Sequence, residues 1–174
     1  SIIPKFERVE DSQLVDVIIK VEEQKTGNFN IGVGYNSTSK LTGMINIEKE
    51  NLGGRGQKAN LNWEFGGEKN NFEIGFYEPW LLDTQTSLDF NLYDKNETTE
   101  DDVDVSKEGG NVILGHPLTE DIKGYLELDY NTIKEDYSNG EQSVDNAASL
   151  TFRSIRDTRN NLLNPHSGAR QEIA

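Results

Sequence analysis

Apolar and polar residues alternate with a period of two along most of this chain. Ala59, Leu61, Trp63 and Phe65, for example, alternate with asparagine and glutamate residues. Such alternation predicts half-buried β-strands, and no stretch shows the sustained 3.6-residue period of an amphipathic helix. The pattern predicts one strand before Gly27, eight after it and a ninth that begins at the end of the chain, over the segments 14–21, 29–35, 41–47, 59–65, 72–76, 88–92, 112–114, 126–130, 148–152 and 169–173.

The connections between these segments also alternate in character. Every second connection is compact and rich in turn-forming residues, as in 51–56, 78–83 and 116–121. The connections between them are polar, and the later two, 94–107 and 134–146, are long and acidic. Compact turns at one end and polar loops at the other predict an all-β fold built as an antiparallel up-and-down meander.

Composition narrows the function classes. The chain has 17 basic and 31 acidic residues, a formal net charge of −14, which argues against a nucleic-acid partner because such proteins present a basic face. It has no cysteine, which excludes a disulfide framework, a thiolate nucleophile and a zinc–thiolate site. The sequence contains no run of about 18 apolar residues, the length that a transmembrane helix requires. The mean hydropathy of −0.71 is typical of a protein in water.

Two features of the strands nevertheless favour a transmembrane β-barrel. The polar face is rich in asparagine and carboxylates, which suit a water-filled lumen. Aromatic residues lie near strand ends, where a membrane–water interface would hold them, at Tyr35, Trp63, Phe65, Tyr77, Trp80 and Tyr130. Low hydropathy is compatible with a barrel, because only alternate strand residues meet lipid. A soluble β-sandwich would alternate in the same way and remains open on the pattern alone.

Several short motifs occur along the chain in an order that is typical of one known protein family. Residues 16–23 and 26–35 form a strand, a break at Gly27 and a Gly-rich strand. Further along follow Glu50-Asn51-Leu52-Gly53-Gly54-Arg55-Gly56, Tyr77-Glu78-Pro79-Trp80, Arg156-Asp157-Thr158-Arg159 and Asn164-Pro165-His166-Ser167-Gly168. The ordered set resembles the BamA-like family of outer-membrane protein assembly factors, from the last POTRA domain into the first half of the barrel.

The resemblance implies a domain organisation. Residues 1–25 would be the end of the last POTRA module, which is periplasmic, and residues 26–174 the N-terminal half of a barrel that has about sixteen strands in the family. The location implied is the outer membrane of a diderm bacterium. The last residues read as a strand that has just begun, so we interpret the chain as a piece of a longer protein. The family's Arg-Gly-Phe-type loop motif and its closing strand would then lie beyond Ala174.

The resemblance also implies a function without bond chemistry, and therefore no enzyme and no cofactor. Such proteins insert other barrels, whose strand edges cannot stay unpaired in lipid. Partners would be outer-membrane lipid, unfolded outer-membrane protein clients and periplasmic accessory lipoproteins. Glycine weakens a strand, so the first barrel strand is hypothesised to form a lateral gate that templates client strands, with Asn28, Phe29, Asn30, Ile31, Gly32, Val33, Gly34 and Tyr35. The expected periplasmic turns contain Gly53, Gly54, Gly56, Pro79, Trp80, Asp157, Pro165 and Gly168.

Alternatives remain at this point. A two-partner-secretion or passive outer-membrane transporter, and a soluble secreted acidic adhesin or binding module, would share the strand pattern. No metal site is predicted: His116 and His166 lack partners at ligand spacing, and the acidic residues 97–104 lack the glycine and closing glutamate of a calcium loop. Arg156, Asp157 and Arg159 are interpreted as a turn network.

Overall fold

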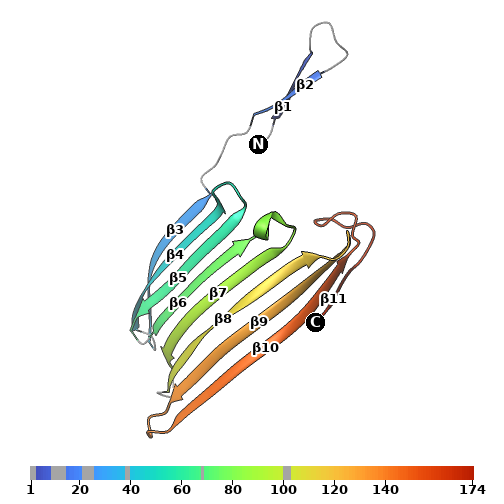
Figure 1. Ribbon diagram of the computed structural model, residues 1–174. Coiled ribbons are helices and arrows are strands. Elements are labelled where there is room, and N and C mark those ends of the chain that lie inside the picture. Colours follow the sequence, from blue (N-terminus) through green and yellow to red (C-terminus); the bar gives the residue numbers. More distant parts are fainter. Residues whose placement is uncertain (1–2, 9–14, 21–25, 38–39, 68, 100–102) are drawn as a thin grey trace.

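A curved antiparallel sheet of nine strands dominates the computed structural model, which describes residues 3–8, 15–20, 26–37, 40–67, 69–99 and 103–174 (Figure 1). Each strand pairs with its neighbours in the chain, in the order β11-β10-β9-β8-β7-β6-β5-β4-β3. The strands are β3 (Gly27–Asn36), β4 (Lys40–Leu52), β5 (Gln57–Gly66), β6 (Lys69–Glu78), β7 (Ser87–Thr98), β8 (Asp104–Pro117), β9 (Ile122–Asp136), β10 (Gln142–Asp157) and β11 (Arg170–Ile173). The predicted all-β meander is therefore confirmed.

A separate two-stranded hairpin precedes the sheet. It pairs β1 (Ile3–Arg8) with β2 (Val15–Lys20) in antiparallel register. Sequence analysis predicted only the second of these strands and was wrong about the first. Residues 3–8 include Pro4 and do not alternate, and a proline ordinarily argues against a strand. Pairing with the strongly alternating β2 stabilises this segment as its partner.

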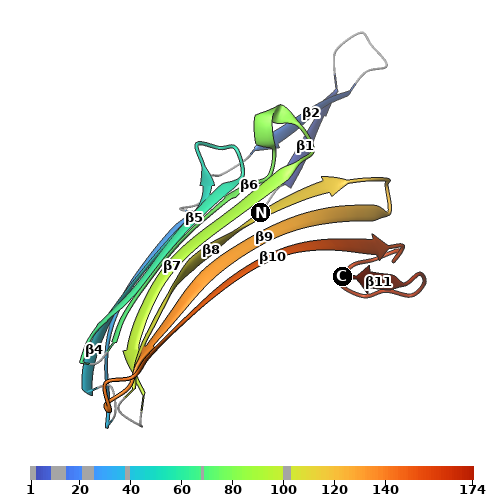
Figure 2. The same cartoon turned by 60° about the horizontal axis from the view of Figure 1, so that its bottom comes forward.

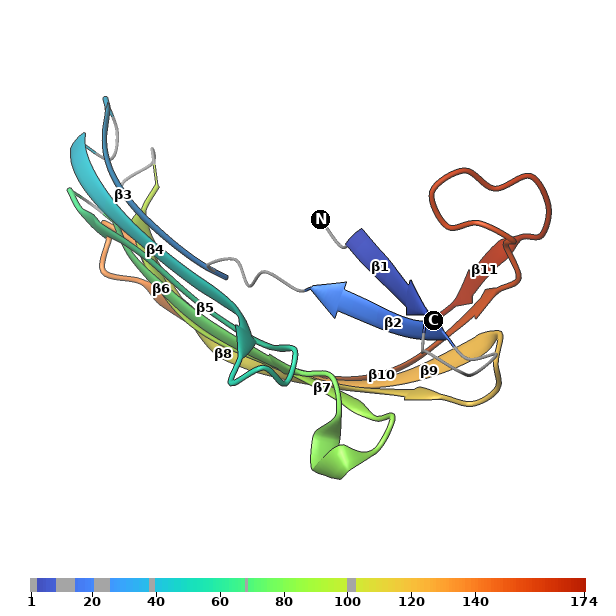
Figure 3. The ribbon, with the colours of Figure 1, turned by 90° about the horizontal axis from the view of Figure 1, so that it is seen from above.

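The sheet forms an open trough rather than a closed barrel (Figures 2 and 3). Its two outer strands are β3 and β11, and no strand in the described ranges bridges them. We call the end at which β3 begins the proximal end; it carries the connections 53–56, 79–86, 118–121 and 158–169. The distal end carries the other connections. Within the described ranges, no helix is long and apolar enough to span a membrane.

The strand register places apolar residues on one face and polar residues on the other. One cross-strand row on the apolar face contains Phe29, Ile47, Leu61, Ile74, Leu92, Gly110, Tyr130 and Ala148. The neighbouring row on the other face contains Asn30, Asn46, Asn62, Glu73, Tyr93, Gly109, Asn131 and Ala147. Side chains alternate between faces with a period of two, so the face of one row determines the face of every other row along the strands.

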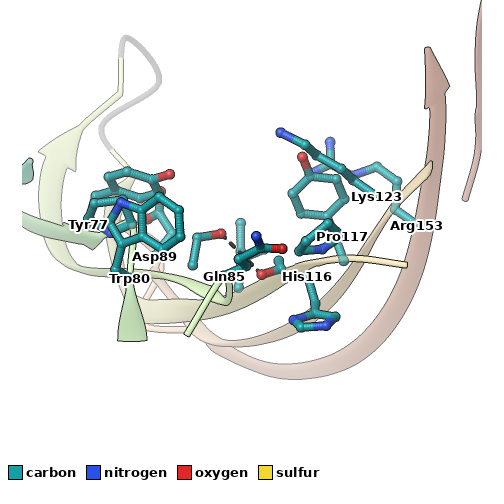
Figure 4. A pocket seen from close by; sticks show the side chains of 13 residues that line it. Tyr77, Trp80, Gln85, Asp89, His116, Pro117, Lys123 and Arg153 are labelled. Carbon is teal, nitrogen blue, oxygen red and sulfur yellow. Dashed lines mark hydrogen bonds between the residues drawn. The ribbon is translucent and has the colours of Figure 1, made fainter. Parts of the chain in front are cut away.

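The polar face is the concave one. In Figure 4, Tyr77, Asp89 and Arg153 lie inside the curve of the sheet, whereas His116 points to the outside. No hydrophobic residue of the nine-stranded sheet or its described connections is buried. The apolar convex face is therefore bare, as shown by Val33 and Leu150, which are 76% and 65% exposed. A soluble β-sandwich would cover such a face with a second sheet, and the described residues supply none.

Candidate membrane face and edge strand

The convex face offers a continuous apolar surface across β3 to β10. Soluble monomers rarely expose a contiguous apolar surface that extends over so many strands. It has one hollow of about 930 Å³, whose lining includes Leu92, Gly110, Val112, Tyr130 and Leu150. The chemistry of this face suits contact with lipid chains rather than with water.

Strand β3 forms the free edge of the sheet on the N-terminal side. It pairs with β4 along its whole length, from Gly27 opposite Lys49 to Asn36 opposite Lys40. Along its other side, no strand of the described ranges bonds to it. The predicted gate residues divide between the two faces: Phe29, Ile31, Val33 and Tyr35 lie on the convex face, and Asn28, Asn30, Gly32 and Gly34 lie on the concave face. An edge of this kind can accept another strand.

The two glycines inside β3 have different surroundings. A Cβ atom at Gly32 would lie 2.5 Å from Cε of Met44, the residue opposite it on β4. At Gly34 the closest atom would be Oγ1 of Thr42, at an ordinary 3.4 Å. Met44 therefore covers Gly32, whereas a Cβ at Gly34 would make only this ordinary contact with Thr42. A Cβ atom can be added at position 34 without moving a neighbour.

Amide side chains link β3 to the next two strands on the concave face. Asn30 Nδ2 donates to Asn46 Oδ1 at 3.5 Å, and Asn46 Nδ2 donates to Asn62 Oδ1. Further along, Lys95 lies 3.2 Å from Glu73 and 5.3 Å from the centre of the Tyr93 ring, which is also approached by Lys107 at 5.6 Å. These contacts satisfy polar groups across the trough and fix the register of the strands.

A pocket of about 510 Å³ opens on the concave face towards the proximal end (Figure 4). Tyr77, Trp80 and Asp89 lie on one side of it, and Lys123 and Arg153 lie on the other. The Arg153 guanidinium stacks 4.8 Å from the centre of the Tyr125 ring and lies 3.5 Å from a Glu172 oxygen. The pocket is lined by aromatic and charged side chains. It brings together residues up to 76 positions apart, from Tyr77 to Arg153, that no local motif connects.

The predicted turn residues all lie in proximal connections or at their borders. Gly53, Gly54 and Gly56 adopt positive φ angles of 60°, 75° and 73°, which glycine accepts without strain. Gly168 has φ 89°, and a Cβ there would collide with the Thr158 carbonyl. Pro165 lies in the same connection, between β10 and β11.

Asp157 ends β10 and receives a bidentate contact from Arg159. Nε and Nη2 of Arg159 donate to the carboxylate at 2.9 and 2.7 Å. The Arg159 guanidinium lowers the pKa of Asp157 from 3.8 to about 2, and the Arg159 backbone N–H adds to the effect. Both residues lie beyond the apolar band, five or more positions after Phe152. The pair closes the first turn of the connection 158–169.

The connection 79–86, which we call the η1 turn, contains a short 3₁₀ helix, η1 (Leu81–Asp83). Leu82 and Asp83 both adopt left-handed conformations, with φ angles of 54° and 58°. Sequence analysis identified Pro79 and Trp80 in this turn but gave no sign of this backbone, because leucine is a residue that rarely adopts it. Asp83 also pairs with Arg55 of the neighbouring turn at 3.0 Å.

The two histidines lie in separate places. His116 Nδ1 lies 2.9 Å from Thr86 Oγ1, and the His166 backbone N–H donates to Asn160 Oδ1. Among the described residues, no group of three or more His, Cys, Asp or Glu side chains could hold a metal ion. The candidate functional features are the convex face, the β3 edge and the proximal turns.

Comparison with known proteins gives a consistent picture. The model of the Omp85 superfamily domain matches residues 51–174. A protein of Treponema pallidum (strain Nichols), described as a putative outer membrane protein assembly factor, is 31% identical over 103 residues, which cover 55% of this chain and 12% of that protein. The outer membrane protein assembly factor BamA of Nitratidesulfovibrio vulgaris is 34% identical over 87 residues, covering 50% of this chain and 11% of that protein.

A solved structure shares the fold. The crystal structure of BamA from Haemophilus ducreyi lacking POTRA domains 1–3 superposes with a TM-score of 0.60 at 23% sequence identity. The superposition covers 99% of this chain and 38% of that one. The chain thus spans a small part of the length of the relatives that it matches.

Proposed function

The chain belongs to the Omp85 superfamily, and from that premise we propose that it forms part of an outer-membrane protein that assembles and inserts other β-barrels. Two of its relatives carry the name outer membrane protein assembly factor. The proposed role requires no catalytic group, because inserting a strand makes backbone hydrogen bonds rather than covalent ones. The convex face would meet lipid, and the concave face would line an aqueous lumen.

The proposed orientation follows from the two ends of the sheet. Residues 1–25, which contain the β1–β2 hairpin, would be the end of a POTRA module in the periplasm, and residues 26–174 would be the first half of the barrel. The proximal turns, including Gly53, Pro79, Asp157 and Gly168, would then face the periplasm. Accessory periplasmic lipoproteins and unfolded client proteins would approach from this side.

The free edge of β3 is the observation that supports the proposed mechanism. Among the strands that the structure describes, none pairs with the outer side of residues 28–35, which carry four exposed apolar side chains. A client strand that pairs with this edge would bring its own apolar face into line with the convex face. Gly32 and Gly34 would keep the edge weakly held, since glycine in a strand interior costs conformational entropy and packs no side chain.

The experiment replaces both glycines by valine in the full-length protein. Unfolded client barrel is added to liposomes that contain each variant, and its folded form is followed by its resistance to SDS without heating. We expect the Gly32→Val/Gly34→Val variant to assemble client more slowly. Gly34→Val alone is the cleaner variant, because it requires no movement of Met44.

The matched control changes the residues opposite these glycines. Thr42→Val and Met44→Val place valine on β4 at the positions paired with Gly34 and Gly32 and leave the sequence of the edge strand unchanged. The control variants should assemble client at the wild-type rate. If the glycine variants fold into liposomes and also assemble client normally, a weak edge plays no part in the function. If the protein is a passive transporter, the wild type itself will assemble no client.

A further inference from the structure

The η1 turn carries a highly exposed apolar residue in a short helix that lies on the convex side of the sheet (Figure 3). Figure 3 shows the turn and its short helix outside the curve of the trough. Leu82 lies in this helix and is 86% exposed. Neighbouring Trp80, by contrast, lines the pocket on the concave side. The turn thus places Trp80 on the concave side of the sheet and the helix that holds Leu82 on the convex side (Figure 3).

The turn is held by a dense set of hydrogen bonds. Leu81 N donates to Thr86 O at 2.8 Å, and Thr84 Oγ1 donates to Leu81 O at 2.7 Å. At its base, the Glu78 carboxylate accepts from Trp80 N at 2.9 Å and from the Gln57 side chain, and Glu78 is only 8% exposed. The exposure of Leu82 is therefore a feature of a defined structure and not of a loose loop.

The backbone of this turn is unfavourable for the residues that occupy it. Leu82 and Asp83 are consecutive non-glycine residues with φ near +55°, a conformation in which Cβ crowds the following carbonyl. Proteins retain such strain where the surroundings determine it, commonly at functional positions. In water, an exposed leucine contributes almost nothing to offset this strain, because it buries little apolar area on folding. Contact of Leu82 with lipid would remove that apolar area from water.

The position of the turn points to the same environment. It follows β6, whose last two convex residues are Phe76 and the nearly buried Glu78, so the turn lies at the proximal border of the convex face. Arg55 of the adjacent turn pairs with Asp83 and remains more than half exposed, at the level where lipid headgroups would lie. An apolar tip beside a paired cation suits a bilayer interface.

We propose that the η1 turn is a membrane wedge: Leu82 inserts from outside the barrel wall into the lipid leaflet at the proximal end. This inference rests on the proposed function, because it requires the convex face to lie in a bilayer. A wedge here would displace lipid beside β6 and β7 and would fix the depth and tilt of the sheet at that point. Its occupant is lipid, and not a soluble protein that docks on the turn.

Spin labels on single cysteines test this directly, because this chain has no cysteine of its own. The full-length protein, with any cysteine outside this segment replaced, is placed in liposomes of phosphatidylethanolamine and phosphatidylglycerol. Labels are introduced by Leu82→Cys, by Leu150→Cys on the convex face and by Glu120→Cys in the exposed turn 118–121. Collisions with oxygen, which partitions into lipid, are compared with collisions with a water-soluble nickel complex.

We expect the oxygen-to-nickel collision ratio to be several-fold higher at position 82 than at position 120, and higher still at position 150. A water-like ratio at 82 with a lipid-like ratio at 150 would overturn the wedge and leave the proposed membrane face intact. A water-like ratio at 150 would refute the membrane face itself. A label at 82 that is immobile and shielded from both reagents would mean that protein covers the turn, which also overturns the lipid wedge.

Discussion

Adjacent residues on β10 provide a direct test of which face meets lipid. Leu150 lies on the convex face, midway between Ala148 and Phe152, and is 65% exposed. Thr151 is the next residue and therefore points into the trough, where Glu127 lies opposite it on β9. Both residues are uncharged, so a change to arginine adds the same charge at nearly the same height in the sheet.

The expected difference between the two substitutions is large. An arginine on the lipid face near the middle of the bilayer costs about 2–4 kcal/mol. Leu150→Arg should therefore lower the folding equilibrium constant by about 30-fold to 700-fold, since each 1.4 kcal/mol is a factor of ten. Thr151→Arg enters a wet, acidic environment beside Glu127, and we expect its effect to stay within about 0.5 kcal/mol.

Urea-induced unfolding of the full-length variants in liposomes measures both values. Folded protein is quantified at each urea concentration by its altered migration in SDS without heating. The two midpoints should differ strongly, with Leu150→Arg the less stable. Equal midpoints, or a larger loss for Thr151→Arg, would refute the assignment of the convex face to lipid and the concave face to water.

Two further predictions concern the polar contacts. In the folded protein the pKa of Asp157 is about 2, below its ordinary value of 3.8, so its pair with Arg159 stabilises the fold above pH 4 and this stabilisation is lost as the pH falls towards 2. The difference in unfolding stability between wild type and Asp157→Asn should accordingly be constant from pH 5 to 8 and shrink below pH 4; a constant difference down to pH 2 would contradict this. Asn46→Ala should cost about 0.5–1.5 kcal/mol in urea unfolding, because it removes the amide link between β3 and β5, and Ser149→Ala on the same face serves as the control.

The sheet could be predicted from the sequence because each strand carries its own signal. Ala148, Leu150 and Phe152 alternate with polar residues, and alternation fixes both the strand and its two faces. The turns could also be predicted where the backbone requires glycine, as at Gly53 and Gly54. These signals are local and need no knowledge of the partner strand.

The features that the sequence did not reveal depend on distant partners or on strain. Strand β1 has no pattern of its own and is defined by its pairing with β2. The concave pocket joins Tyr77 and Arg153 only through the accumulated register of the strands between them. The left-handed backbone at Leu82 contradicts the preference of leucine, so no rule based on residue type would have placed it there.

The neighbour-to-neighbour order of the strands has a consequence for how the sheet forms. Every contact between strands is closed by one hairpin, so the loop-closure entropy of each step is small and assembly can proceed strand by strand. Each added strand, however, moves the unpaired edge outward without removing it. In a bilayer every unpaired backbone group on that edge costs several kcal/mol. The intermediate with the longest exposed edge would therefore set the kinetic barrier. That edge would be formed by β9 or β10, which are the longest strands of the described sheet.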